Sequence, residues 1–118
     1  MANCNIKTHG NSIVASWKGL KADSNGVSFD CTFLKPLTVS CEGNFGEGGF
    51  IVMEGSIGGK FQNIETAHGG IVSAMSENME SLSGRYLSVR PIVVGGSEET
   101  SIDVYLFCDT IPKRRAGK

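Results

Sequence analysis

The sequence of 118 residues has few residues of the kinds that usually carry chemistry. It contains two histidines and one tryptophan, and its four cysteines show no C-x-x-C spacing: Cys4, Cys31, Cys41 and Cys108. Histidine is the most frequent general acid or base, and closely paired cysteines are the usual sign of a structural zinc site. The sequence therefore favours a binding or structural protein over an enzyme, and we expect no cofactor and no metal.

Long apolar runs and an excess of one charge are also absent. No stretch approaches the roughly 20 apolar residues of a membrane helix, and no charged segment followed by an apolar run opens the chain. Eleven basic residues face twelve acidic ones, which gives a net charge of -1. We expect a protein made in the cytoplasm with reduced thiols, no membrane partner and no direct contact with nucleic acid.

Glycine is abundant, with 16 residues against three prolines. Apolar side chains alternate with polar ones, which indicates strands with one buried face. The clearest examples are Ile13–Trp17, Val27–Phe33, Leu37–Cys41 and Ile102–Cys108. Short strands separated by glycine turns predict an all-β fold of about eight antiparallel strands. We expect a sandwich, jelly-roll-like, or a small barrel.

The length fits one domain with one core. We expect an N-terminal arm at 1–11, a β-sandwich domain at 12–110 and a basic C-terminal tail at 111–118. Within the domain, Gly43–Phe50 predicts a reversal between two antiparallel strands. Ile71–Gly84 predicts a strand followed by a short helical turn or loop.

Two further segments have specific signals. The stretch EGSIGGKF (Glu54–Phe61) is one residue short of a phosphate-binding loop and has Phe61 in place of the hydroxyl, so a β-hairpin tip is the better interpretation. Pro91 lies in an extended segment, where its missing N–H predicts an edge position or a bulge.

Several stretches together resemble the small all-β head decoration, or cement, proteins of tailed bacteriophages. They are SWKGL, CEGNFGEGGFIVMEGSIGGKFQNI, RYLSVRPIVVGG and SIDVYLF, and the resemblance spans about Val14 to Phe107. It implies a virion protein on the capsid surface, without an active site, that joins neighbouring copies of the major capsid protein. The resemblance also implies a homo-oligomer, dimer or trimer.

Partner-binding residues are expected on glycine-rich tips, outward aromatics and the termini. The candidates are Asn44, Phe45, Glu47, Ile57, Lys60, Tyr86, Tyr105, Lys113, Arg114 and Arg115. The strand face that carries Tyr105 and Phe107 is open to two interpretations, a partner surface or a second buried face of a two-layer sandwich.

Other functions remain open from the residues alone. A carbohydrate-binding sandwich would use exposed Trp17, Tyr86 or Tyr105 as a sugar platform. A small hydrolase would use His68 with a cysteine or glutamate. A zinc site could be assembled from Cys31, Cys41 and His68, although their spacing does not require one.

Overall fold

The computed structural model describes residues 3–64, 73–74, 78–82 and 86–110. Over these residues the chain forms ten β-strands and no helix. They are β1 (Cys4–His9), β2 (Ser12–Leu20), β3 (Phe29–Asp30), β4 (Leu34–Asn44), β5 (Phe50–Ser56), β6 (Gln62–Asn63), β7 (Ser73–Ala74), β8 (Asn78–Ser81), β9 (Ser88–Val94) and β10 (Ser101–Thr110). The predicted all-β class is confirmed. None of the described segments is a helix of the length and apolarity needed to cross a membrane.

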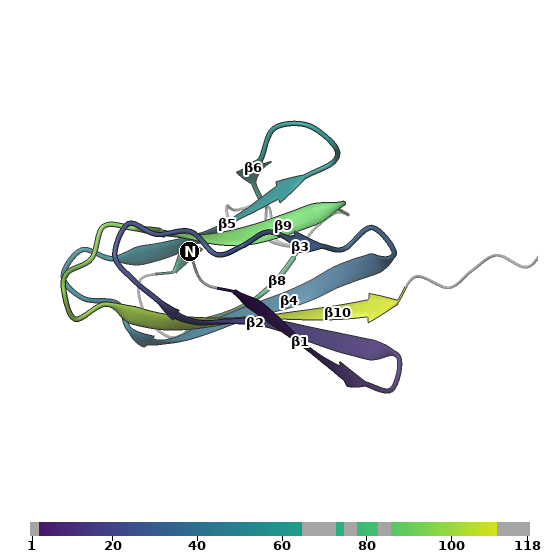
Figure 1. Cartoon of the computed structure of the whole chain (residues 1–118), viewed down its shortest axis with the longest axis horizontal. Coiled ribbons are helices and arrows are strands. Elements are labelled where there is room, and N and C mark those ends of the chain that lie inside the picture. Colours follow the sequence, from purple (N-terminus) through teal and green to yellow (C-terminus); the bar gives the residue numbers. More distant parts are fainter. Residues whose placement is uncertain (1–2, 65–72, 75–77, 83–85, 111–118) are drawn as a thin grey trace, which may run out of the picture.

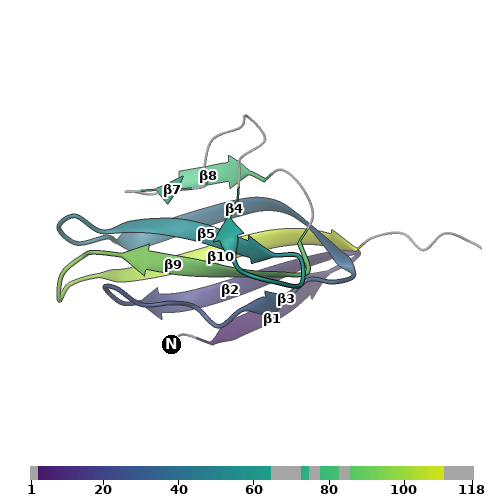
Figure 2. The same cartoon turned by 90° about the horizontal axis from the view of Figure 1, so that it is seen from above.

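The strands form two stacked antiparallel sheets (Figures 1 and 2). The first sheet has the order β1-β2-β10-β4-β8. The second has the order β3-β9-β5-β6, and β7 also pairs with β5. Of the expected alternatives, the structure is therefore a sandwich.

The core lies between the two sheets and depends most on β2 and β10, where the predicted alternation is confirmed. Ala15 and Trp17 of β2 and Val104 and Leu106 of β10 are fully buried. The indole nitrogen of Trp17 donates a hydrogen bond to the carbonyl oxygen of Val27 at 2.7 Å. Trp17 therefore fills the core and also joins the first sheet to the segment that leads into the second.

The alternation in β4 is interrupted at Leu37. Phe107 of β10 pairs with Thr38, but the next residue, Cys108, pairs with Pro36, so Leu37 is an extra residue on β4. Such a β-bulge reverses the inside-outside order on one side of it. Val39 and Cys41 face the core as predicted, whereas Leu37 is only half-buried and Pro36 is buried instead.

The predicted reversal at Gly43–Phe50 links strands of different sheets. β4 belongs to the first sheet and β5 to the second, so this connection crosses between the layers and is not a hairpin. By contrast, the hairpin predicted around EGSIGGKF is confirmed, because Glu54 of β5 pairs with Asn63 of β6 and Gly55 with Gln62.

Part of the segment expected as an N-terminal arm is a strand. β1 pairs with β2 along its whole length, from Cys4 with Trp17 to His9 with Ser12. The two strands are joined by Gly10 and Asn11, and Gly10 has a φ of 62°. Glycine with positive φ at the first central position is typical of a type II′ hairpin turn.

Pro91 lies on β9, an inner strand that pairs with β5 on one side and with β3 on the other. The Pro91 carbonyl accepts a hydrogen bond from the Gly26 amide at 2.9 Å, on the side away from β5. The nitrogen of a strand residue points to the same side as its carbonyl, so the missing donor faces this side as well. Residues 23–26 run along this side, and their backbone is joined to β9 from Asp23 to Gly95, from Val93 to Ser24 and from Gly26 to Pro91. Proline therefore leaves out one bond of this ladder, the return bond to the Gly26 carbonyl, next to the bridge of Asn25 with Ile92.

The structure describes only parts of Ile71–Gly84. Ser73–Ala74 forms β7 and Asn78–Ser81 forms β8, so extended backbone occupies part of the range where a helical turn or loop was expected. Residues 75–77 and 83–84 lie outside the described residues, and so does the predicted basic tail at 111–118.

Candidate binding surfaces

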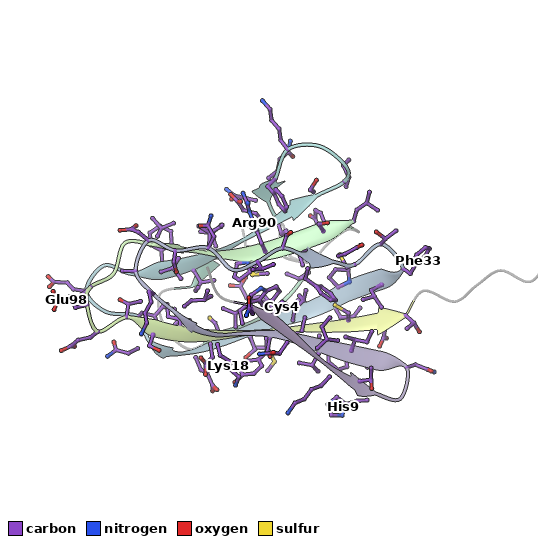
Figure 3. All side chains as sticks on the ribbon, viewed as in Figure 1. Cys4, His9, Lys18, Phe33, Arg90 and Glu98 are labelled. Atoms are coloured by element: carbon purple, nitrogen blue, oxygen red, sulfur yellow. The ribbon has the colours of Figure 1, made fainter. Side chains whose placement is uncertain are left out.

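One end of the sandwich is acidic. It is formed by the connection from β4 to β5 and the connection from β9 to β10, and Glu98 marks it in Figure 3. The side chains there surround an open hollow of about 550 Å³, and we call this surface the acidic end: Asn44, Gly46, Glu47, Ser97, Glu98 and Glu99. Asn44 and Glu47, two of the predicted contact residues, are exposed here.

Hydrogen bonds hold the loops of the acidic end in place. The buried Thr100 hydroxyl donates to the Phe45 carbonyl oxygen at 3.1 Å and accepts from the Ser97 amide at 2.8 Å. The Asn44 side-chain oxygen accepts from the Gly46 amide at 2.9 Å. The Thr100 hydroxyl therefore joins the two loops to each other, and the Asn44 side chain closes the turn at Gly46.

Phe45 was wrongly predicted to face a partner. Its side chain is buried in the core cluster, with 7% of its surface exposed. Gly43, Gly46 and Gly48 around it all have positive φ, which lets the chain turn sharply enough to direct this aromatic ring inward. The glycines shape the loop, and Phe45 anchors it.

The opposite end of the sandwich is apolar, and Phe33 marks it in Figure 3. Phe33 is 81% exposed, Ile57 is 76% exposed and Leu87 is 41% exposed. Near them lies an open hollow of about 380 Å³ lined by Thr32, Leu34, Ile57, Tyr86 and Leu87. We call these five residues and Phe33 the apolar end. It contains two predicted contact residues, Ile57 and Tyr86.

Phe33 and Leu87 were not predicted as surface residues. The sequence placed Phe33 on the buried face of a strand, but β3 ends at Asp30 and the chain turns at once. Asp30 accepts hydrogen bonds from both the amide and the hydroxyl of Thr32, and the Leu34 amide donates to the Cys31 carbonyl. The signal for this turn was the Asp-x-Thr spacing, in which an aspartate caps the backbone two residues on.

The hairpin that carries Ile57 is held by several polar contacts. The Ser56 hydroxyl donates to the Gly59 carbonyl at 2.9 Å and accepts from the Gly58 amide at 3.1 Å. Beside the tip, Arg90 donates to Glu54 at 3.0 Å and lies over the Phe61 ring, 4.0 Å from its centre. The exposed position of Ile57 therefore rests on an ordered tip.

Tyr86 lies beneath that hairpin and is half-buried. A methyl group on Gly55 would come within 2.4 Å of its ring, so glycine at position 55 is needed for the ring to pack there. Lys60, predicted as a contact, is exposed near the tip.

A third surface lies on the outer face of the first sheet. It is an apolar groove of about 430 Å³ lined by Val14, Thr38, Ser40, Met79, Tyr105 and Phe107. Phe107 is 39% exposed, which confirms that the outer face of β10 is not a second buried layer at this position. The Tyr105 hydroxyl donates to Glu42 at 3.3 Å, and Lys18 lies over the Tyr105 ring, 4.4 Å from its centre.

The predicted contact residues therefore do not form one site. Asn44 and Glu47 lie at the acidic end, Ile57 and Tyr86 at the apolar end, and Tyr105 on the outer face of the first sheet. Lys113, Arg114 and Arg115 lie outside the described residues.

The buried thiols are poorly suited to nucleophilic chemistry. Burial is the main reason that the pKa of Cys4 and of Cys31 is raised to about 11 and that of Cys108 to about 12. A thiol is nucleophilic as the thiolate, so these groups are protonated and unreactive near neutral pH. All four cysteines are free.

The described residues offer little support for a zinc site, a histidine-dependent hydrolase or a sugar platform at Trp17. No group of three or more histidine, cysteine, aspartate or glutamate side chains there is arranged to hold a metal ion. His9 is exposed on β1, and His68 lies outside the described residues. Trp17 is fully buried, so the expectation that it could serve as an exposed sugar platform is wrong.

Comparison with known proteins gives the fold and no family. No protein-family model matches the chain, and no curated protein matches it either. The crystal structure of SPBc2 prophage-derived protein YomS is similar, with a TM-score of 0.55 and 14% identity over 86% of this chain and 98% of that one. At this identity the likeness shows a shared sandwich fold.

Two other structures have lower scores. Protein NMB1881 from Neisseria meningitidis has a TM-score of 0.43 and 13% identity over 91% of this chain and 83% of that one. A structure of Bacillus endospore appendages, described as a novel family of disulfide-linked pili, has a TM-score of 0.44 and 11% identity over 95% and 92%.

Proposed function

We propose that this chain is a structural protein of a phage particle. In this role it binds the outer surface of the capsid, links neighbouring major capsid subunits and catalyses no reaction. The proposal draws on the sequence pattern of phage decoration proteins and on a fold shared with a prophage-derived protein.

The observation that carries the proposal is the apolar end. Ile57 and Leu87 are exposed and line one hollow at this end, and Phe33 is exposed between Thr32 and Leu34, which line the same hollow. Scattered exposed apolar residues are ordinary, but a cluster of them indicates a surface that a partner covers. Phe33 is presented by a hydrogen-bonded turn and Ile57 by an ordered hairpin, so both are held in position before binding. Such preorganisation reduces the entropy lost on association.

A capsid offers a physical reason for this arrangement. A protein that binds only the expanded, mature lattice stabilises that lattice by mass action, and many modest contacts over one shell act together. In this view the apolar end fits a recess that exists only between subunits of the expanded shell.

The test uses shells assembled from the major capsid protein encoded in the same genome. The purified chain is mixed with expanded and with unexpanded shells, and co-sedimentation is measured. We expect binding to expanded shells only. Absence of binding to both forms would contradict the proposed function.

Variants locate the contact surface. Phe33→Ser combined with Ile57→Ser should remove binding, because it removes the two most exposed apolar side chains of this end. The double variant should still fold, since both side chains are mostly exposed and contribute little to stability. Glu98→Gln, at the acidic end, serves as the matched control and should bind normally. Unchanged binding of the double variant would show that the apolar end is not the contact surface.

A carbohydrate-binding module is the remaining alternative, and the buried Trp17 cannot contribute to its sugar-binding surface. Tyr105 is the aromatic best placed for it, on the groove of the outer face. Binding to a glycan array that is lost in Tyr105→Ala would support this function over the first.

A further inference from the structure

The first sheet ends in an edge strand that is long enough to pair with another strand. β1 has six residues, and within the described part of the chain it pairs only with β2. At the outer edges of the two sheets, β8 has four residues and β3 and β6 have two each. Unpaired N–H and C=O groups along an edge are a template for strand addition, and β1 offers the longest run of them. Figure 2 shows β1 along one side of the sandwich.

The register determines which backbone groups face outward. The Thr110 amide donates to the Asn11 carbonyl, so the backbone N–H and C=O of Asn11 point toward β10. In a strand, the backbone groups of every second residue point to the same side. The odd-numbered residues of β2 therefore face β10 and the even-numbered ones face β1. The partners of those even-numbered residues are Asn5, Lys7 and His9. The backbone groups of the alternate residues, Cys4, Ile6 and Thr8, consequently point to the open edge.

The side chains of the edge add an apolar contact and a charge. Ile6 pairs with the fully buried Ala15, so it lies on the core side of the sheet, yet it is 55% exposed. Lys7 lies on the opposite face, beside Val14. A charged side chain in the middle of an edge strand restricts which partners and registers are acceptable.

We propose that the occupant of this edge is a second copy of the chain, with the two β1 strands antiparallel and Ile6 opposite the second copy's Ile6. This arrangement is isologous, because each residue of one copy meets the symmetry-related residue of the other. It joins the two first sheets, each of five strands, into one continuous sheet of ten.

This register satisfies the most backbone groups. Hydrogen-bonded pairs must join outward-pointing residues, and with Ile6 at the centre there are three such pairs: Ile6 with Ile6, and Cys4 with Thr8 in both directions. A shift of two residues either way leaves only two pairs. The shift that centres on Lys7 also places two lysines directly opposite one another, which is unfavourable.

The proposed register also pairs the remaining side chains. Asn5 lies opposite the second copy's Lys7 in a non-hydrogen-bonded pair, where side chains approach most closely. On the core side, the two Ile6 side chains cover each other's exposed surface. The edge is thus complementary to itself in length and hydrogen bonding, and the register keeps the two Lys7 side chains from facing each other.

Sedimentation equilibrium of the intact chain provides the first test. We expect a mass that rises with concentration toward twice 12.5 kDa. Ile6→Asp should leave the protein monomeric, because it places two carboxylates opposite one another at the centre. Ile57→Asp is the control, since Ile57 is exposed at the apolar end and should not affect dimerisation.

Disulfide trapping tests the register. In a Cys4→Ser background, Asn5→Cys and Lys7→Cys variants are oxidised separately and as a mixture. The proposed register brings positions 5 and 7 of different copies together, so covalent dimers should form in the mixture and in neither variant alone. Dimers of Asn5→Cys alone or of Lys7→Cys alone would indicate a shifted register.

The inference is independent of the proposed capsid function. A monomer at all concentrations, without covalent dimers in the mixture, would overturn it even if the chain binds expanded shells. Conversely, a dimer with the predicted register would stand if shell binding failed.

Discussion

The two ends of the sandwich differ in what they leave exposed. At the acidic end, hydrogen bonds of Thr100 and Asn44 hold the loops in place. Glycines with positive φ allow the chain to turn there, and the Phe45 side chain points into the core. At the apolar end, a turn closed by a hydrogen bond from the Thr32 amide to Asp30 directs Phe33 outward. Loop order and apolar exposure are therefore separate properties. The acidic end contributes to stability, whereas the exposed side chains of the apolar end contribute little to it and fit a role in binding.

The largest effect is expected at Gly46. A methyl group there would lie 2.3 Å from the Thr100 hydroxyl oxygen and 2.9 Å from the Ser97 nitrogen, at a φ of 69°. Gly46→Ala should destabilise the fold by about 3 kcal/mol, from backbone strain plus displacement of the Thr100 hydrogen bonds. Gly48→Ala is the matched control: its φ is 74° and nothing lies within 4 Å, so strain alone should cost about 1 kcal/mol. Urea unfolding measures both, and equal losses would refute the role given to Thr100.

A smaller loss is expected when the Thr100 hydroxyl is removed. Thr100→Val keeps the shape but leaves the Ser97 amide and the Phe45 carbonyl without this partner. We expect a loss of about 2 kcal/mol in the free energy of unfolding. Thr100→Ser, which retains the hydroxyl, should recover most of it. A Thr100→Val protein as stable as the native chain would mean that these hydrogen bonds do not hold the acidic end.

Alkaline pH should weaken the apolar end through Cys31. Its thiol donates to the Tyr86 carbonyl at 3.0 Å, and burial raises its pKa from 9.0 to about 11. Because the folded-state pKa lies above the unfolded one, the contribution is full below pH 9 and is lost as pH rises through about 11. The loss due to this group is about 1 kcal/mol per pH unit in that window.

The measurement is urea unfolding of the native chain and of Cys31→Ala at pH 8 and pH 10. Stability of the native chain should fall more steeply with pH than that of the variant. Parallel curves would show that Cys31 is not responsible. Cys4 and Cys108 have pKa values raised in the same direction, so a residual slope is expected in the variant.

The smallest effect on stability is expected at Phe33. With 81% of its surface exposed, Phe33→Ser should change the free energy of unfolding by no more than about 0.5 kcal/mol. Thermal unfolding measures this. A loss comparable to that of Thr100→Val would mean that the apolar end is part of the folded core, and the contrast between the ends would disappear.

Burial was predicted best in strands where the two-residue alternation of apolar and polar side chains is not interrupted. The alternation along β2 and β10 predicted which side chains are buried, because a strand with one face on the core needs that pattern and little else. The hairpin at Glu54–Phe61 was predicted for a similar local reason, since its glycines are needed for the tip.

The errors arose where pairing between strands distant in the sequence determines which side chains are buried and which strands are neighbours. The bulge at Leu37 shifts the inside-outside order of β4, and only its pairing with β10 reveals it. The crossing from β4 to β5 changes sheets, which a two-residue period cannot show. β1 was missed because an exposed edge strand does not need apolar alternation, although the Gly10-Asn11 pair was a usable hairpin signal.

The candidate surfaces were less predictable than the fold. Asn44, Glu47, Ile57 and Lys60 were predicted as contact residues at loop tips, and all four are exposed. Sequence position could not show that Asn44 and Glu47 line one hollow and Ile57 another. Phe33 was missed because an aromatic in an alternating run predicts burial. A short aspartate-capped turn instead ends the strand before it.

The position of Trp17 between the sheets has a practical consequence. It is the one tryptophan of the chain, and its indole is shielded from solvent and hydrogen-bonded to Val27. Its fluorescence emission should therefore be blue-shifted in the native protein and move to longer wavelength only when the two layers separate. Because Trp17 is remote from solvent, a partner that docks on either end should leave the emission maximum in place, so one optical signal can distinguish unfolding from association.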